Sequence, residues 1–203
     1  MQFSESKTMN NLMLTFAGEC QSHTRYLLAA NQATKQQLPV IRQVFEYTAK
    51  QELTHAQLVM QRLTQNGITR IHVQADYPLA PDDLAGALAE SRDHEFEQAN
   101  SIYPAFAETA SQEGFTQEAE LFRQLAEIER GHAERFAQFA QRMQNDALFR
   151  ENAQIMWLCM NCGHLHFGTE PPKTCPVCGA VQGLAVRGTE PPQALPASVS
   201  ASA

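Results

Sequence analysis

Four long segments of the chain carry stripes of apolar residues spaced alternately four and three positions apart, and a glutamate interrupts every stripe. This spacing places the residues of a stripe along one face of an α-helix, here called the apolar seam. The stripes predict four helices, at about residues 8–36, 39–65, 81–113 and 117–147. The interrupting glutamates, one to each helix in this order, are Glu19, Glu52, Glu95 and Glu129. A fold that buries these seams must therefore neutralise four carboxylates.

The interruptions form an internal repeat, because the first and second glutamates are 33 residues apart and the third and fourth are 34 residues apart. Histidine follows the second and fourth glutamates by three positions, as Glu52-x-x-His55 and Glu129-x-x-His132. Residues i and i+3 share one face of a helix. Each motif therefore directs a carboxylate and an imidazole the same way.

Burying these groups unpaired would cost too much. A buried carboxylate without a partner costs several kcal/mol, and four would exceed the net stability of about 5–15 kcal/mol of a typical domain. Lysine and arginine are absent from the seams, so the counter-charges must come from outside the chain. Two single glutamates with two Glu-x-x-His motifs are the ligand pattern of di-iron and di-manganese carboxylate bundles. Mixed carboxylate and imidazole ligands favour iron or manganese.

This pattern predicts a dinuclear site in which Glu52 and Glu129 bridge the two ions, while Glu19 and Glu95 are terminal ligands. We therefore expect a mainly α protein whose residues 1–150 form a four-helix bundle. The connection 68–80 is long for a bundle, so we expect a crossover between the second and third helices from one end to the other. Pro104 should kink the third helix, and Thr116 can cap the fourth.

The composition changes after Arg150, where cysteine, glycine and proline rise. Two matching Cys-x-x-Cys-Gly knuckles follow, twelve residues apart, and they predict a tetrahedral four-thiolate metal site within a small domain at 151–188. The spacing leaves zinc and iron open. The tail 189–203 is of low complexity and predicted to be disordered. The four thiolate residues are Cys159, Cys162, Cys175 and Cys178; the fifth cysteine, Cys20, is expected to be a small core residue.

Charge and hydropathy exclude some functions. The formal net charge of −7 argues against nucleic acid or an anionic membrane surface as the main partner. No apolar run approaches the roughly 18 residues that a membrane span needs. The N-terminal residues lack a secretory signal pattern, so we expect a cytoplasmic protein.

The sequence resembles the rubrerythrin family over nearly its whole length, to about residue 188. The matching motifs are Asn11-Leu12, Phe16-Ala17-Gly18-Glu19, Arg25-Tyr26, Glu52-x-x-His55, Glu95, Ile102-Tyr103-Pro104, Phe106-Ala107, Glu113-Gly114-Phe115, Glu129-x-x-His132, Glu134-Arg135-Phe136 and the two cysteine knuckles. The resemblance implies a ferritin-like bundle with a di-iron centre, fused to a rubredoxin-like β/knuckle domain that holds iron.

The resemblance also implies a peroxidase that reduces hydrogen peroxide to water in oxidative-stress defence. Electrons would come from NAD(P)H through a separate reductase or rubredoxin and then through the four-cysteine iron. By resemblance His132 ligates one iron and His55 the other in the reduced state, and Tyr26 and Tyr103 hydrogen-bond ligand carboxylates. The brief linker between the domains predicts a homodimer in which the small domain lies near the partner's di-iron site. The family resemblance implies that this homodimer is head-to-tail or domain-swapped.

One position departs from the family pattern. The family usually has a second glutamate three residues after the one matched by Glu95, and an iron moves between it and the histidine matched by His55 on redox change. Here that position is Gln98. We expect His55 to stay bound in both redox states, or Gln98 to ligate weakly through its oxygen, and the di-iron potential to rise.

Two other functions compete with the peroxidase. The helical half is also typical of a ferritin-like iron-binding or ferroxidase protein. An iron-storage protein, however, does not need a four-cysteine site that delivers electrons. A sensing module, in which the four thiolates hold zinc, is the second alternative.

Overall fold

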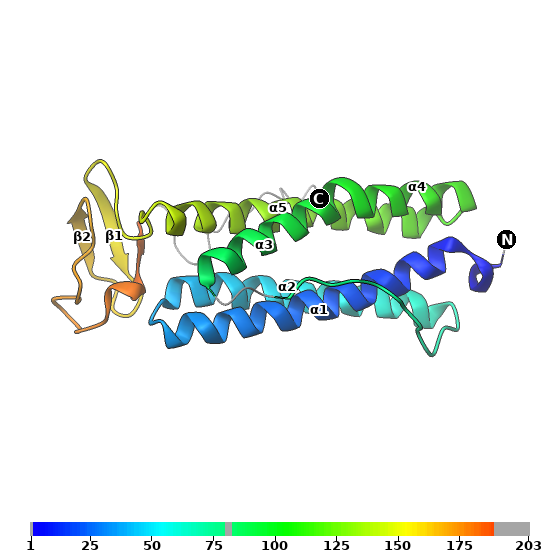
Figure 1. Ribbon diagram of the computed structural model, residues 1–203, viewed down its shortest axis with the longest axis horizontal. Helices are drawn as coiled ribbons and strands as arrows, with labels where there is room; N and C mark the ends of the chain where they lie inside the picture. Colours follow the sequence, from blue (N-terminus) through cyan, green and yellow to red (C-terminus); the bar gives the residue numbers. More distant parts are fainter. Residues whose placement is uncertain (1, 80–82, 189–203) are drawn as a thin grey trace.

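The computed structural model describes residues 2–79 and 83–188, which form a long helical bundle with a small sheet at one end (Figure 1). The long helices are α1 (Lys7–Lys35), α2 (Pro39–Gln65), α3 (Leu84–Glu97), α4 (Tyr103–Glu113) and α5 (Thr116–Gln144). A one-turn 3₁₀ helix, η1 (Phe3–Glu5), precedes α1, and a π-helical turn, η2 (Gln98–Ile102), joins α3 to α4. The expected disordered tail, 189–203, and residues 81–82 of the expected third helix lie outside the described residues.

The helices form two antiparallel layers. Helix α1 packs along α2, and the continuous arm α3–η2–α4 packs along α5. The chain between α2 and α3 runs back along the length of the bundle as an extended segment, so that α1 and α3 begin at opposite ends (Figure 1). The predicted four-helix bundle with a long crossover is confirmed.

The expected irregularity at Pro104 takes the form of the π turn directly before it. Proline has no N–H, and its ring collides with the carbonyl four residues earlier in a regular α-helix. The backbone N–H of Tyr103 bonds instead to the carbonyl of Gln98, five residues earlier, which is the wider spacing of a π turn.

The π turn also explains why the two halves of the repeat differ by one residue. Glu19 and Tyr26 are seven residues apart, whereas Glu95 and Tyr103 are eight apart, with the π turn between them. From Tyr26 to the glutamate of α2, and from Tyr103 to the glutamate of α5, the distance is 26 residues in both halves. The extra residue of the second half is therefore taken up where η2 widens the helix.

A side chain closes the start of α1, and a left-handed glycine closes the end of α4. The carboxylate of Glu113, the last residue of α4, accepts hydrogen bonds from the backbone N–H groups of Lys7 and Thr8 at the start of α1. Gly114, which follows α4, has a left-handed φ of 86°, and this conformation favours glycine. The expected capping role of Thr116 is wrong, because Phe115 is the N-cap and Thr116 is already the first helical residue.

The C-terminal part of the chain forms a three-stranded antiparallel sheet of β1 (Ile155–Cys159), β2 (Leu165–Gly168) and β3 (Ala185–Arg187), in the order β2-β1-β3. In its register Leu158 pairs with Leu165 and with Val186. A 3₁₀ turn, η3 (Gln182–Leu184), precedes β3. The sheet is tied to the bundle by Arg187, which donates to the carbonyl of Ala147 at 2.8 Å.

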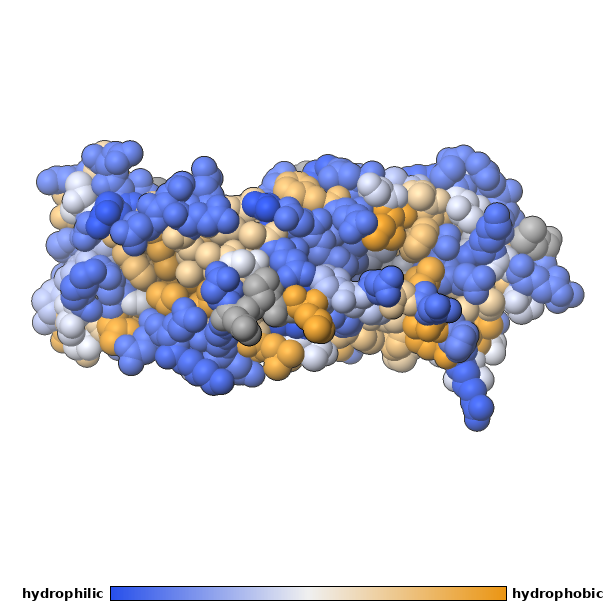
Figure 2. Space-filling view, viewed as in Figure 1, coloured by the Kyte–Doolittle hydropathy of each residue, from blue (hydrophilic) through white to orange (hydrophobic). Residues whose placement is uncertain are grey.

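Two apolar clusters fill the bundle, and the glutamates of the seams lie between them. One cluster surrounds Phe45 and Phe136, and the other surrounds Leu12 and Phe122. On the face shown in Figure 2, hydrophobic side chains occur in separate groups between larger hydrophilic areas. Within the described residues, no helix has the length and apolarity to cross a membrane.

Candidate metal centres

Six side chains from four helices meet at the middle of the bundle. Their potential ligand atoms form two groups. In each group, all the ligand atoms lie within 4.8 Å of one another. The first group consists of Glu19, Glu52, His55 and Glu129, and the second of Glu52, Glu95, Glu129 and His132. All six are buried. The structure thus brings together every bundle residue that the sequence assigned to a dinuclear site, and two glutamates belong to both groups.

The shared glutamates each direct one oxygen towards each histidine. Glu129 has Oε1 at 3.1 Å from Nδ1 of His55 and Oε2 at 2.6 Å from Nδ1 of His132. Glu52 has Oε2 at 3.6 Å from Nδ1 of His55 and Oε1 at 2.8 Å from Nδ1 of His132. The two carboxylates therefore lie between the two imidazoles.

These close approaches lack hydrogen-bond geometry. Both carboxylate oxygens of Glu52 and of Glu129, and Nδ1 of both histidines, have no hydrogen-bond partner among the described residues. Buried polar atoms are nearly always paired, and an unpaired buried charge is strongly destabilising. The lone pairs of these oxygen and nitrogen atoms point to common positions without forming hydrogen bonds to each other. Metal ions at those positions would be suitable partners for them.

The pKa values in the cluster are displaced in opposite directions. Burial raises the pKa of Glu19 and of Glu95, and the charges of Glu52 and Glu129 raise both further. For the histidines, burial acts to lower the pKa, but the nearby carboxylates, Glu129 first among them, together outweigh it, and the pKa of both His55 and His132 is raised.

The shared glutamates behave in the opposite way. Burial acts to raise the pKa of Glu52, but the positive charge of His132 and the close approach of both histidines together outweigh it, and the net shift is downward. The pKa of Glu129 is lowered as well, against burial and the charge of Glu52, by the positive charges of His132 and His55. With protons as the only counter-charges, two imidazolium ions would balance these two carboxylates. Two divalent cations can take the place of those protons together with the protons of Glu19 and Glu95.

Two arginines of the matching motifs are buried near this cluster, which the sequence did not predict because they lie outside the seams. Arg25 donates to Ser22, and Arg135 donates to Thr48 at 2.9 Å and to Gln51 at 3.2 Å. Their hydrogen bonds go to neutral partners, so these side chains leave the ligand atoms of the glutamates free to bind metal.

Glu19 and Glu95 each belong to only one of the two groups. Each of them accepts a hydrogen bond from a tyrosine of the facing layer of helices. Tyr26 of α1 donates to Oε1 of Glu95, and Tyr103 at the start of α4 donates to Oε1 of Glu19. Burial is the largest influence on the pKa of both tyrosines and raises it, so both hydroxyls keep their protons. These contacts place both tyrosines where the family resemblance expected them.

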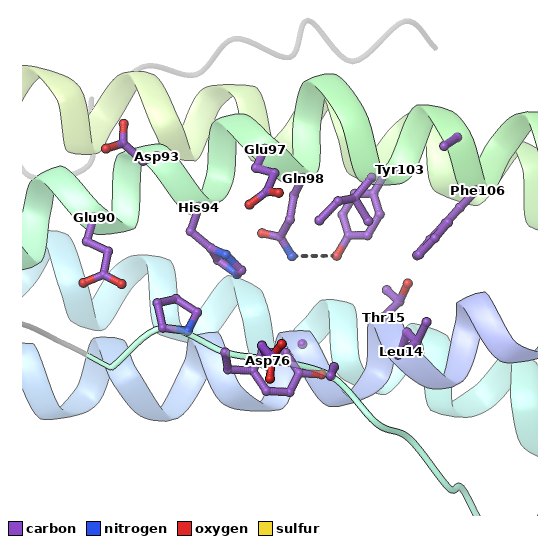
Figure 3. A pocket seen from close by; sticks show the side chains of 16 residues that line it. Leu14, Thr15, Asp76, Glu90, Asp93, His94, Glu97, Gln98, Tyr103 and Phe106 are labelled. Carbon is purple, nitrogen blue, oxygen red and sulfur yellow. Dashed lines mark hydrogen bonds between the residues drawn. The ribbon is translucent and has the colours of Figure 1, made fainter.

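Gln98 lies in the π turn, next to Tyr103. Its Nε2 donates to the Tyr103 hydroxyl at 3.0 Å, while its Oε1 has no hydrogen-bond partner among the described residues (Figure 3). Both side chains line a cavity together with His94, which the sequence did not single out. Burial lowers the pKa of His94 to about 4. The only feature of the sequence that could have pointed to His94 was its position one residue before Glu95.

The four cysteines of the small domain converge on one point. Sγ of Cys159 lies 3.8 Å from Sγ of Cys178, and Sγ of Cys162 lies 3.7 Å from Sγ of Cys175. A tetrahedral site with metal–sulfur bonds of about 2.3 Å requires sulfur–sulfur separations of about 3.8 Å. The observed separations fit one metal ion held by four thiolates.

The glycines after the knuckles have the expected backbone conformation. Gly163 and Gly179 have φ values of 76° and 73°, which turn the following backbone N–H groups towards sulfur. The side chain of Asn161 and the N–H of Ala180 donate to Cys178 and lower the pKa of its thiol to about 6. The expectation for Cys20 is wrong: its side chain is exposed on α1, because its position falls outside the seam.

Comparisons with known proteins agree with both centres. A family profile described as rubrerythrin matches residues 10–138 and 86–155, and a rubrerythrin rubredoxin-like domain profile matches 157–184. A rubrerythrin of Clostridium perfringens is 34% identical over 175 residues, covering 85% of this chain and 90% of the relative.

Two solved structures are similar as well. The fully reduced, all-ferrous state of nigerythrin has a TM-score of 0.61 at 26% identity and covers 92% of this chain and 91% of its own. The bacterioferritin of Desulfovibrio desulfuricans has a TM-score of 0.64 at 17% identity, covering 70% of this chain and 82% of its own. The latter likeness concerns the fold alone. The chain thus carries a carboxylate site of the di-iron type and a rubredoxin-like four-cysteine site.

Proposed function

This chain belongs to the rubrerythrin family, and from that premise we propose that it is a non-haem di-iron peroxidase that reduces hydrogen peroxide to water. One observation carries the proposal: a cluster able to hold two redox-active ions and a four-thiolate site able to deliver electrons occur on the same chain. A storage protein needs only the first of these.

In this proposal Glu52 and Glu129 would each help to hold both irons, since each directs one oxygen to either histidine. Glu19 and His55 complete one side, and Glu95 and His132 the other. Two bound iron ions would supply electrons and Lewis acidity to cleave the O–O bond of peroxide.

The chain's own residues orient the ligands and keep bulk water away. Tyr103 and Tyr26 each hold a proton on Oη and donate it in a hydrogen bond to a terminal glutamate, which fixes that carboxylate. Phe45 and Phe136 pack on Tyr26, with ring centroids 6.0 and 5.0 Å from it. Such packing restricts the site to a preorganised geometry in surroundings of low polarity.

Electrons would be relayed from NAD(P)H by a separate reductase or rubredoxin to iron at the four cysteines. Within one chain the two sites are far apart. His132 lies twelve residues before Gln144, the last residue of α5, which is about 18 Å along the helix axis, and the linker and small domain follow beyond it. We therefore propose a homodimer in which the small domain of one chain serves the di-iron site of its partner.

Gln98 alters the usual ligand exchange of the family. Its Nε2 is engaged by Tyr103, and it offers one neutral oxygen where a carboxylate would add a negative charge. We expect His55, which already lies among three glutamates, to remain a ligand in both redox states. A carboxylate that replaces His55 in a crystal structure of the oxidised protein would refute this.

The test is anaerobic reduction of the iron-loaded protein followed by stoichiometric hydrogen peroxide, with both iron chromophores followed by absorbance. Re-oxidation of both centres on the timescale of turnover supports the peroxidase. A ferritin-like ferroxidase would instead accumulate a large iron core when given ferrous iron and oxygen, and would re-oxidise slowly with peroxide. A colourless small domain that contains zinc would remove the electron inlet and favour a sensing role.

A further inference from the structure

A cavity of about 540 Å³ lies between α1, the crossover segment, α3 and the start of α4 (Figure 3). Exposed residues form its mouth, among them Asp76 of the crossover and Ala105 of α4. Buried residues form its inner end, among them Thr15 and Gln98. The cavity therefore leads from solvent into the bundle.

The inner end reaches the residues around the candidate di-iron site. Tyr103 lines the cavity, and its hydroxyl donates to Glu19 and accepts from Gln98. A molecule that fills the cavity is thus separated from the ligand carboxylates by one layer of side chains.

Three polar atoms of the cavity lining are buried without a hydrogen-bond partner among the described residues. They are Oη of Tyr77, Nε2 of His94 and Oε1 of Gln98. In Figure 3 the side chains of His94 and Gln98 extend from α3 and η2 towards the crossover, into the space of the cavity. The Tyr77 hydroxyl can donate and the Gln98 oxygen can accept, which matches a hydroperoxide group, since –OOH has one O–H donor and two acceptor oxygens.

The remaining lining is largely apolar and too large for hydrogen peroxide alone. Ligand pockets commonly measure about 300–1,000 Å³, whereas a water molecule occupies roughly 30 Å³ and hydrogen peroxide little more. The apolar side chains are Leu14, Ala75, Pro78, Ile102, Ala105 and Phe106. A compact apolar group fits these walls better than a small polar molecule does.

The charge of the lining selects among organic molecules. Four carboxylates, and neither lysine nor arginine, are found among the residues that line this cavity: Asp76, Glu90, Asp93 and Glu97. Arg92, outside the lining, pairs with Asp93. An anionic molecule, such as a fatty-acid hydroperoxide, would be repelled, and a neutral one would not.

From this geometry we propose that the cavity binds neutral organic hydroperoxides with a compact apolar group as substrates, an inference that rests on the peroxidase function. In the reaction the O–O bond of ROOH breaks, two electrons and two protons are taken up, and ROH and water leave. The electrons come from the same external reductant that serves hydrogen peroxide.

Binding and turnover are tested separately. Cumyl alcohol, the product of cumene hydroperoxide, is titrated into the oxidised iron-loaded protein by calorimetry, and saturable binding is expected. Cumene hydroperoxide and its para-carboxylate, which differ in charge, are then given to the reduced protein. We expect the neutral compound to re-oxidise it at least tenfold more efficiently at low salt.

Two variants address the cavity itself. Ala105→Trp fills the mouth from an exposed position, and Leu14→Trp fills it from α1; each should weaken cumyl alcohol binding at least tenfold. The matched control is Gln112→Trp, an exposed position of α4 outside the cavity, which should bind cumyl alcohol as the parent does.

The outcomes separate this inference from the proposed function. If hydrogen peroxide re-oxidises the protein but cumyl alcohol does not bind and cumene hydroperoxide does not react, the substrate proposal is wrong and the peroxidase stands. If cumyl alcohol binds but neither peroxide reacts, the peroxidase is wrong and with it the role of organic hydroperoxides as substrates. Equal rates for the neutral and anionic compounds would overturn the selection by charge.

Discussion

The hydroxyl of Tyr103 donates a hydrogen bond to Oε1 of Glu19, joining two residues that are 84 positions apart. The reciprocal contact, from Tyr26 to Glu95, joins the same two layers of the bundle. Each layer thus supplies one terminal glutamate and the tyrosine that orients the glutamate of the other layer. Because Tyr103 also contacts the cavity, it connects the proposed substrate site with the proposed iron ligands.

Removing the Tyr103 hydroxyl should weaken metal binding. In Tyr103→Phe, Glu19 loses its donor and Nε2 of Gln98 loses its acceptor. Loss of a group that orients a ligand typically costs about 10–100-fold in metal affinity. The measurement is a competition titration of ferrous iron against a chelator. Tyr26→Phe is the matched variant on the other side, and unchanged affinity in both would contradict the assigned roles.

Gln98→Glu should introduce the ligand exchange that we propose to be missing in this chain. The added carboxylate contributes a negative charge, which stabilises the oxidised irons and lowers their reduction potential. A redox titration of the di-iron absorbance measures the shift, and a crystal structure of the oxidised variant should show the introduced carboxylate in place of His55 as a ligand. The control is Glu97→Gln, which changes one charge at the neighbouring exposed position. A potential that is unchanged or higher in Gln98→Glu argues against our interpretation of this position.

Iron binding should release protons and weaken in acid. The raised pKa values of Glu19, Glu95, His55 and His132 mean that these four groups hold protons which metal ions must displace. We expect a measurable number of protons to be released for each pair of ions near pH 7. Calorimetry in buffers of different ionisation enthalpy measures this number. Affinity that does not fall as the pH is lowered would show that the ions bind elsewhere.

Glu113 should stabilise the start of α1 in a pH-dependent way. Burial acts to raise its pKa slightly, but hydrogen bonds from Thr8 and Lys7 outweigh it, and the pKa lies below the ordinary value of 4.5. A lowered folded-state pKa means that the stabilisation is present above about pH 4.5 and is lost as the pH falls through the lowered value. Glu113→Ala should cost about 1 kcal/mol at pH 7, the usual effect of a cap.

Denaturant unfolding at pH 7 and at about pH 3 tests this prediction, since the difference from the parent should shrink in acid. Glu108→Ala is the control, because Glu108 is exposed on α4 and bonds within its own helix, to Gln112. A loss of stability for Glu113→Ala that is equally large at both pH values would show that packing rather than the charged cap is responsible.

Substituting one thiolate should separate the two centres. Cys178→Ser removes the ligand whose thiol has the lowered pKa, and the small domain should lose its iron and its visible colour. The bundle should still bind two irons, because its ligands lie on other elements. Metal analysis and absorbance give both numbers. Loss of iron from both sites would mean that the domains fold as one cooperative unit.

The sequence by itself determined which side chains meet in the bundle cluster and in the four-cysteine cluster. Carboxylates in apolar seams cannot be buried without a partner that neutralises them. A Cys-x-x-Cys-Gly knuckle is typical of a metal-binding site. These patterns are local in sequence, and burying such groups without a partner would destabilise the fold strongly. Their spacing was therefore sufficient to identify them. The expectation for Cys20 failed because its position lies outside the seam, and the expectation for Thr116 failed because cap geometry depends on the backbone path into the helix.

Tertiary structure alone decided how the two halves of the repeat correspond and what lies beside the metal site. The extra residue in the second half is absorbed by the π turn before Pro104, since a widened turn is what frees the chain from the proline ring. That turn brings Gln98 against Tyr103, and both side chains line the cavity under the crossover. Contacts between segments distant in sequence depend on packing, which periodicity along a single helix does not encode.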